Sequence, residues 1–128
     1  MKVVHRDALH NDDFEEVNGK LRTKKTSRSY LVTFQNGAQP WNNNTAPGLR
    51  KCNIKNSFGI IHLDFKKTNN NPVVAVLPDD CPTPVDLIED QLHDGNTVYI
   101  DAGSRVVRCY GVTNVRYVVN LVGYFNDN

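Results

Sequence analysis

Three stretches in the second half of the chain decide the predicted fold: LPDDCP at residues 77–82, TVYID at residues 97–101 and RCYG at residues 108–111. The residues around the last two alternate between apolar and polar side chains, which is typical of strands with one buried face. Pro78 and Pro82 lack the N–H group that a sheet requires, and the residues 102–104 (AGS) favour a turn. This order predicts a strand, a proline-bounded loop and then a hairpin.

The same two-residue period recurs over most of the chain. We expect about seven or eight short strands, separated by turn residues such as Asn36-Gly37 and Asn56-Ser57, and no long helix. The fold class predicted is therefore all-β, a small antiparallel Greek-key barrel or sandwich. The expected strands cover residues 29–34, 52–55, 58–65, 73–77, 85–88, 98–101, 106–110 and 115–125.

The first 27 residues differ in composition from the rest, so we expect an N-terminal arm or neck at 1–27 and a β head domain at 28–128. The spacing of Phe14, Val17 and Leu21 permits a short helix, capped by Asp12 or Asp13 and stopped at Asn18-Gly19. An extended arm that gains order by packing on another subunit is the alternative, because an isolated helix of this length is marginal in water.

The last predicted strand is apolar on both faces. Val118 and Val122 lie on the face opposite Val119 and Leu121. A strand that is covered on one side only does not need this second apolar row. We therefore expect the second face to pack on another sheet or on another subunit, as around a three-fold axis in a homotrimer.

Length and charge exclude several classes of protein. A chain of 128 residues is long enough for one domain with a real core. The formal net charge of +1 and the lack of basic runs interleaved with aromatic residues argue against nucleic acid as a partner. With no apolar run near the ~20 residues of a membrane span and no secretory signal pattern, we expect a soluble protein made in the cytoplasm, with no membrane partner.

The residues that carry catalysis or bind metals form no recognisable pattern. Asp79-Asp80 and Glu89-Asp90 are adjacent carboxylates that point apart, whereas glycosidases need two carboxyl groups facing one bond. The four histidines and three cysteines lack metal-ligand spacing. We predict no enzyme activity, no metal and no cofactor, and we expect the cysteines to be small buried hydrophobes.

Binding chemistry has more support. Sugars are bound by aromatic rings and by planar polar side chains, and both kinds occur on the predicted hairpin and near it. Tyr99 and Asp101 share a strand face, although Tyr99 can also cap the core and Asp101 can stabilise the turn. The candidate saccharide-binding residues are Tyr99, Asp101, Arg105 and Tyr110 on the hairpin, the second pair His62 and Asp64, and Trp41 in the asparagine-rich loop.

The order of these motifs over residues 49–125 resembles the C-terminal receptor-binding head domain of baseplate or tail-fibre proteins of tailed phages that infect Gram-positive bacteria. Those heads have a Pro-x-x-(Phe/Cys)-x-Pro type loop, a His-Ile-Asp strand, a short turn and a strand that ends in an aromatic residue and glycine. Here Tyr99 stands at the position of the histidine, and Cys109-Tyr110 stands where a tryptophan and a second aromatic residue are common.

The resemblance implies a non-enzymatic adhesion domain at the tail tip or baseplate of a virion, made in the host cytoplasm and binding a host cell-wall polysaccharide or another surface glycan. It also implies that the N-terminal segment attaches the head to other baseplate or tail proteins. A structural baseplate or capsid-decoration domain without glycan binding is the alternative. A carbohydrate-binding module of a hydrolase is a third, more distant reading.

Overall fold

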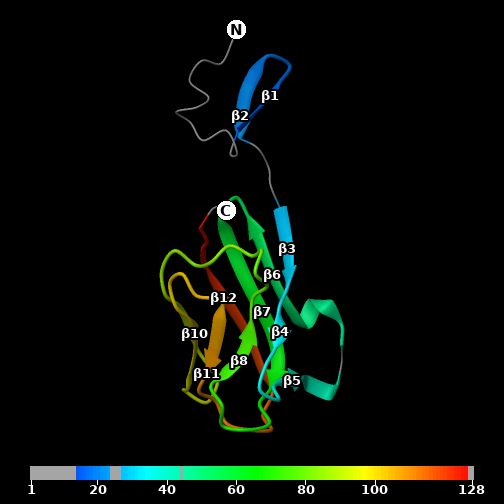
Figure 1. The fold of residues 1–128 in the computed structure, drawn as a ribbon, viewed down its shortest axis with the longest axis vertical. Coiled ribbons are helices and arrows are strands. Elements are labelled where there is room, and N and C mark those ends of the chain that lie inside the picture. The colour runs from blue at the N-terminus through cyan, green and yellow to red at the C-terminus, as the bar shows by residue number, and fades with distance from the viewer. Residues whose placement is uncertain (1–13, 24–26, 44, 127–128) are drawn as a thin grey trace.

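The computed structural model describes residues 14–23, 27–43 and 45–126. Its main body is a sandwich of two antiparallel five-stranded sheets, one of them curled, which confirms the predicted all-β class (Figure 1). No α-helix occurs in the described ranges, only the short 3-10 turns η3 (Trp41–Asn43) and η4 (Pro47–Leu49). None of these helical turns is long and apolar enough to cross a bilayer.

The first sheet is built around the longest strand and is called the β7 sheet. Its order is β12–β7–β6–β3, and the short β5 also pairs with β7. All of its pairings are antiparallel, and β12 pairs with β7 over its full length, from Phe58↔Tyr124 to Phe65↔Tyr117. The strands are β3 (Ser27–Leu31), β5 (Gln39–Pro40), β6 (Arg50–Lys55), β7 (Phe58–Lys66) and β12 (Tyr117–Tyr124).

The second sheet, called the β10 sheet, has the order β4–β8–β11–β10–β9. Strand β8 continues into the long proline-rich connection to β9 and yet lies beside β11, which is a Greek-key arrangement. The strands are β4 (Thr33–Phe34), β8 (Val73–Val76), β9 (Ile88–Gln91), β10 (Thr97–Ile100) and β11 (Val106–Cys109).

The expected strand over residues 29–34 passes from one sheet to the other. β3 pairs with β6, whereas β4 pairs with β8. The change occurs at Val32, which is fully buried and whose N–H and C=O are bonded to the Arg50 backbone and side chain. Splits of this kind give more and shorter strands than the alternation alone suggests.

The inner faces of the two sheets form one core. Ile61, Leu63 and Phe65 of β7 and Val98 and Ile100 of β10 are completely buried, as the alternation predicts. All three cysteines are buried free thiols, as expected. The expected strand start at residues 85–88 needs correction, because β9 begins only at Ile88 and the side chains of Val85 and Leu87 are exposed.

The N-terminal segment contains a hairpin rather than the short helix that its apolar spacing permits. β1 (Phe14–Val17) pairs with β2 (Lys20–Thr23) and with neither sheet of the sandwich. Asn18 and Gly19 both have positive φ, at 52° and 77°, which is the geometry of a tight two-residue hairpin turn. The proposed caps Asp12 and Asp13 lie outside the described residues, and the domain boundary at 27/28 remains a prediction.

Candidate functional site

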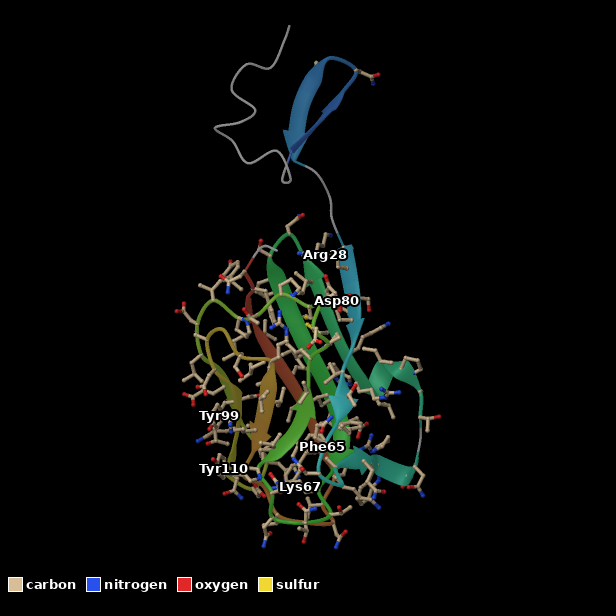
Figure 2. All side chains as sticks on the ribbon, in the orientation of Figure 1. Arg28, Phe65, Lys67, Asp80, Tyr99 and Tyr110 are labelled. Carbon is tan, nitrogen blue, oxygen red and sulfur yellow. The ribbon has the colours of Figure 1, made fainter. Side chains whose placement is uncertain are left out.

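Two tyrosines on the outer surface of the β10 sheet form an aromatic pair, in which Tyr110 is exposed and Tyr99 is half-buried. Tyr99 lies in β10 between the buried Val98 and Ile100, so its side chain points outward. Tyr110 follows β11, and its N–H donates to the Thr97 carbonyl at 2.9 Å. The two rings are nearly parallel, 9° apart with centroids at 6.1 Å (Figure 2). The prediction that these residues lie on one hairpin is confirmed by the β10–β11 pairing.

Charged side chains flank this pair in one row across the sheet. Tyr99 lies opposite Arg108 of β11 on one side and opposite Glu89 of β9 on the other. The pKa of the Tyr99 hydroxyl is raised, chiefly by its hydrogen bond with Tyr110 and by desolvation, and further by Asp101. The outer surface formed by Glu89, Tyr99, Arg108 and Tyr110 is called the aromatic face.

An open hollow of about 450 Å³ adjoins the aromatic face and is lined by Glu89, Asp90, Gln91 and Thr97. Sequence reasoning weighed Glu89 and Asp90 only as a catalytic pair and did not single out Arg108. The sequence pattern does indicate that Arg108 points outward, since it alternates with Val107 and Cys109 in the same way as Tyr99 alternates with Val98 and Ile100. Glu89 could be placed beside Tyr99 only with the β9–β10 register in hand.

Asp101 follows β10 directly and is exposed. Its carbonyl accepts the Ser104 N–H at 3.1 Å, which closes the predicted 102–104 turn. The same turn is tied to the proline-rich connection, because Gly103 N–H donates to the Pro84 carbonyl at 2.9 Å. Asp101 therefore stands at the edge of the aromatic face, and its influence on the pKa of Tyr99 reflects this closeness.

Arg105 comes from the same hairpin but is directed elsewhere. Its Nη2 donates to the Cys81 carbonyl at 3.0 Å, and its Nε is buried without a hydrogen-bond partner among the described residues. This guanidinium supports the 77–82 loop, so the structure separates Arg105 from Tyr99 and Tyr110.

His62 and Asp64 point away from the core on β7 of the other sheet, His62 half-buried and Asp64 buried, and each has a partner in the chain. His62 Nδ1 is 2.7 Å from Asn120 Oδ1. Asp64 accepts two bonds from Arg116, at 3.0 Å from Nε and 2.6 Å from Nη2. These hydrogen bonds to Asp64 raise the pKa of the Arg116 guanidinium. The pair predicted as a second sugar contact thus forms polar links from β7 to Asn120 in the middle of β12 and to Arg116, which precedes β12.

Trp41 occupies a third location. It begins η3, beside the β5–β7 pairing, and Lys66 Nζ of β7 stands 5.7 Å from the centroid of its ring. This is a cation–π contact within the chain. The seven candidate residues are therefore divided: Tyr99, Tyr110 and Asp101 lie on the β10–β11 hairpin, His62 and Asp64 on β7, Trp41 in η3, and Arg105 is directed to the 77–82 loop.

The outer surface of β7 and β12 also carries a row of exposed apolar side chains. Register places Tyr124 opposite Phe58 and Val122 opposite Ile60, and the rings of Phe58 and Tyr124 meet edge to face with centroids 5.4 Å apart. The residues of this surface, called the apolar face, are Phe58, Ile60, Val118, Val122 and Tyr124. A hollow of about 170 Å³ extends it toward Val85 and Leu87. The other sheet of the chain does not cover this face.

The described residues contain no group of three or more histidine, cysteine, aspartate or glutamate side chains placed to hold a metal ion. Asp79 and Asp80 are exposed in the loop after β8, and Glu89 and Asp90 are exposed and successive on β9. The side chains of the aromatic face can thus bind a polyhydroxylated ligand by stacking and by hydrogen bonding.

Comparison with known proteins adds no family assignment. No model of a protein family matches the chain, and neither a curated protein nor a solved structure does so.

Proposed function

We propose that this chain is a receptor-binding domain of a phage tail or baseplate, which holds a saccharide of a Gram-positive cell surface without altering it chemically. The aromatic face is the observation that carries the proposal. Two nearly parallel tyrosine rings offer apolar faces to the C–H surface of a sugar, while Arg108, Glu89 and Asp101 offer hydrogen bonds to its hydroxyl groups. The order of motifs that resembles phage head domains supports the same assignment.

The apolar face supports assembly into a homotrimer. Phe58, Ile60, Val122 and Tyr124 form a contiguous apolar surface at one end of the β7–β12 pair. Contiguous apolar patches on the surface of a protein commonly mark contacts with other chains. In a trimer, this surface would face the other subunits and leave the aromatic face on the other sheet accessible. The N-terminal segment would then attach the trimer to other baseplate or tail proteins.

A structural baseplate or decoration domain is the second candidate function. The apolar face favours a structural domain as much as it favours a receptor-binding domain, because both kinds of domain must assemble with other chains. The two candidates differ at the aromatic face, which a purely structural domain has no need to leave open to solvent.

The experiment that separates them is a binding assay of the purified chain against an array of wall polysaccharides and teichoic acids from Gram-positive bacteria. The proposal expects saturable binding to a small set of glycans, each recovered with unchanged mass. Absence of binding across the array and to intact cells would favour the structural role. A shortened glycan would identify an enzyme instead.

A further inference from the structure

Two of the three buried cysteines meet across the sandwich although they are distant in sequence. Cys52 lies in the middle of β6, and Cys81 lies in the loop that follows β8. Both side chains are completely buried, and their Sγ atoms lie 3.9 Å apart, within hydrogen-bonding distance for two thiols. The two sulfurs are thus in van der Waals contact, and a disulfide requires that they close to ~2.05 Å.

The third cysteine is separate from this pair. Cys109 lies in β11, where its carbonyl accepts a bond of 2.8 Å from the buried Lys67 Nζ. Among the described residues, the sulfur–sulfur hydrogen bond joins Cys52 and Cys81 and does not involve Cys109. The chain therefore holds a cysteine pair and, in the same core, a buried cysteine that serves as an internal control.

Cys81 is buried in a loop whose preceding residues reach the solvent. Asp79 and Asp80, the two residues before it, are exposed. The loop turns at this point, with the Cys81 N–H donating to the Pro78 carbonyl at 3.0 Å. In Figure 2 the labelled Asp80 and Arg28 both lie toward the end of the sandwich where β3 begins. A molecule close to the size of water needs only a local opening of this loop to reach the thiol.

We propose that Cys52 and Cys81 are a redox-active pair, which a hydroperoxide converts to an intramolecular disulfide that fastens the 77–84 connection to β6. This modification site goes beyond the proposed function and does not depend on it.

The reaction balances with one peroxide. The Cys81 thiol loses its proton, and its sulfur attacks one peroxide oxygen; the O–O bond breaks, and the released hydroxide takes up a proton to leave as water. Cys81 is then a sulfenic acid. Cys52 sulfur attacks the Cys81 sulfur, the S–O bond breaks, and hydroxide leaves with the Cys52 proton as a second water. Two thiols and one hydrogen peroxide thus give one disulfide and two waters, with two electrons passing from sulfur to oxygen.

The surroundings assign the first step to Cys81. Its pKa is lowered, chiefly by its hydrogen bond with Cys52 and also by the positive charges of Arg105 and Arg28, against the opposing effects of burial and Asp80. The pKa of Cys52 is raised by the same hydrogen bond and by burial. Since the thiolate is the reactive form, Cys81 attacks first and Cys52 resolves the intermediate.

The disulfide would restrict the motion of the 77–84 connection, which is hydrogen-bonded to the 102–104 turn beside the candidate binding site. The Cys81 carbonyl holds Arg105, and the Pro84 carbonyl holds Gly103 next to Asp101. Closing the link between residues 52 and 81 also restricts the unfolded chain. Oxidation should therefore raise the melting temperature by roughly 10 °C.

The test uses the full chain, reduced, freed of reductant and treated with a small excess of hydrogen peroxide. We expect the intact mass to fall by two hydrogen atoms, and two of the three thiols to become unreactive toward a maleimide after denaturation. Peptide mapping should place the link between Cys52 and Cys81, and a phosphine should reverse both the mass change and the rise in melting temperature. Cys109→Ala should behave as the wild type does, whereas Cys81→Ala should keep its mass or gain oxygen only.

Three results would overturn the proposal. One is that all three thiols remain reactive after treatment. Another is a link that includes Cys109. The last is a wild-type chain in which Cys81 accumulates as sulfinic or sulfonic acid while Cys52 stays reduced, because the resolving step would then be absent.

Discussion

The two outer surfaces of the sandwich are built by the same kind of antiparallel pairing but carry different side chains. The aromatic face places charged groups beside two tyrosines, with Tyr110 53% exposed. The apolar face surrounds Tyr124, which is 65% exposed, with valine, isoleucine and phenylalanine. Inner positions on both sheets are equally apolar, so the core does not distinguish the two sheets. The difference teaches that the two sheets are distinguished by the outward half of the alternation, which is the half on which the proposed ligand site and the proposed subunit contact both rest.

The largest expected effect comes from placing a charge on the apolar face. Val122→Lys should dissociate the proposed trimer or cause aggregation, because burying an unpaired ammonium between subunits costs several kcal/mol. Sedimentation velocity at micromolar concentration measures the change. Val112→Lys is the matched control, since Val112 and Val122 are 50% and 44% exposed and only Val122 belongs to the apolar face. A wild-type chain that sediments as a monomer would remove the assembly role from this face.

A smaller effect is expected from the edge of the aromatic face. Asp101→Ala should weaken binding to wall polysaccharide about 10- to 100-fold per site, because a charge-assisted hydrogen bond contributes roughly 1.5–3 kcal/mol. The melting curve should not change, since the 102–104 turn is closed by the backbone of Asp101 and not by its side chain. Equal binding by the variant would take Asp101 out of the site, and a parallel loss of stability would assign it to the turn.

Stability should depend on contacts that belong to neither face. The Tyr117 hydroxyl donates to Asp94 Oδ2 at 2.6 Å and accepts the Val112 N–H at 2.7 Å. Tyr117→Phe leaves that N–H without its partner and should lower the melting temperature by about 5 °C. The oligomeric mass and the glycan affinity of Tyr117→Phe should equal those of the wild type. This result would separate the role of the core in stability from the roles proposed for the two outer surfaces. Unchanged thermal stability would show that water replaces the hydroxyl at no cost.

The smallest effect concerns pH. The hydrogen bond from Tyr117 and the backbone of Asn96 hold the pKa of Asp94 below its ordinary value of 3.8. A carboxyl group with a lowered pKa in the folded state stabilises the fold above the unfolded pKa, and this contribution is lost as the pH falls through the folded pKa. The difference in melting temperature between wild type and Asp94→Asn should therefore be constant near neutral pH and shrink below about pH 4. A difference that persists unchanged in acid would contradict the assigned ionisation.

The Tyr117 hydroxyl has the opposite dependence at high pH. Burial and the Asp94 carboxylate raise its pKa to about 12 from 10.0. Between these values the unfolded chain loses the proton and the folded chain retains it, so stability decreases as the pH rises. The same pair of residues thus weakens the fold at both extremes of pH.

The sequence predicts the parts of this structure that depend on local chemistry. Alternation identified Ile61, Leu63, Val98 and Ile100 as core residues, and Asn56-Ser57 as a hairpin turn. The short helix that the spacing of Phe14, Val17 and Leu21 permits is not formed, because a three-four spacing of apolar residues is compatible with more than one structure. Asn18-Gly19 is a strong hairpin signal, and in the fold it outweighs that spacing.

Contacts between segments that are distant in the chain could not be predicted from the sequence. Nothing local to Arg105 indicates that its guanidinium turns toward Cys81, and nothing in the cysteine spacing indicates that Cys52 meets Cys81. The candidate site was predicted in part for the same reason. Tyr99 and Tyr110 lie on one hairpin and could be associated, whereas His62, Asp64 and Trp41 belong to elements whose placement depends on the sheet order.

The most direct test compares two exposed tyrosines, one on each outer face. Monovalent oligosaccharide from the best-bound glycan is titrated into Tyr110→Ala and Tyr124→Ala by calorimetry, and the oligomeric mass of each variant is measured in the same buffer. Tyr110→Phe, which retains the ring, serves as a control for stacking. We expect Tyr110→Ala to remain a trimer and lose about 10-fold in affinity, in line with about 1.4 kcal/mol of stacking and contact. Tyr124→Ala should weaken the proposed trimer and keep the glycan affinity of each site. Equal glycan affinity in Tyr110→Ala and the wild type would contradict the assignment of the aromatic face as the binding surface.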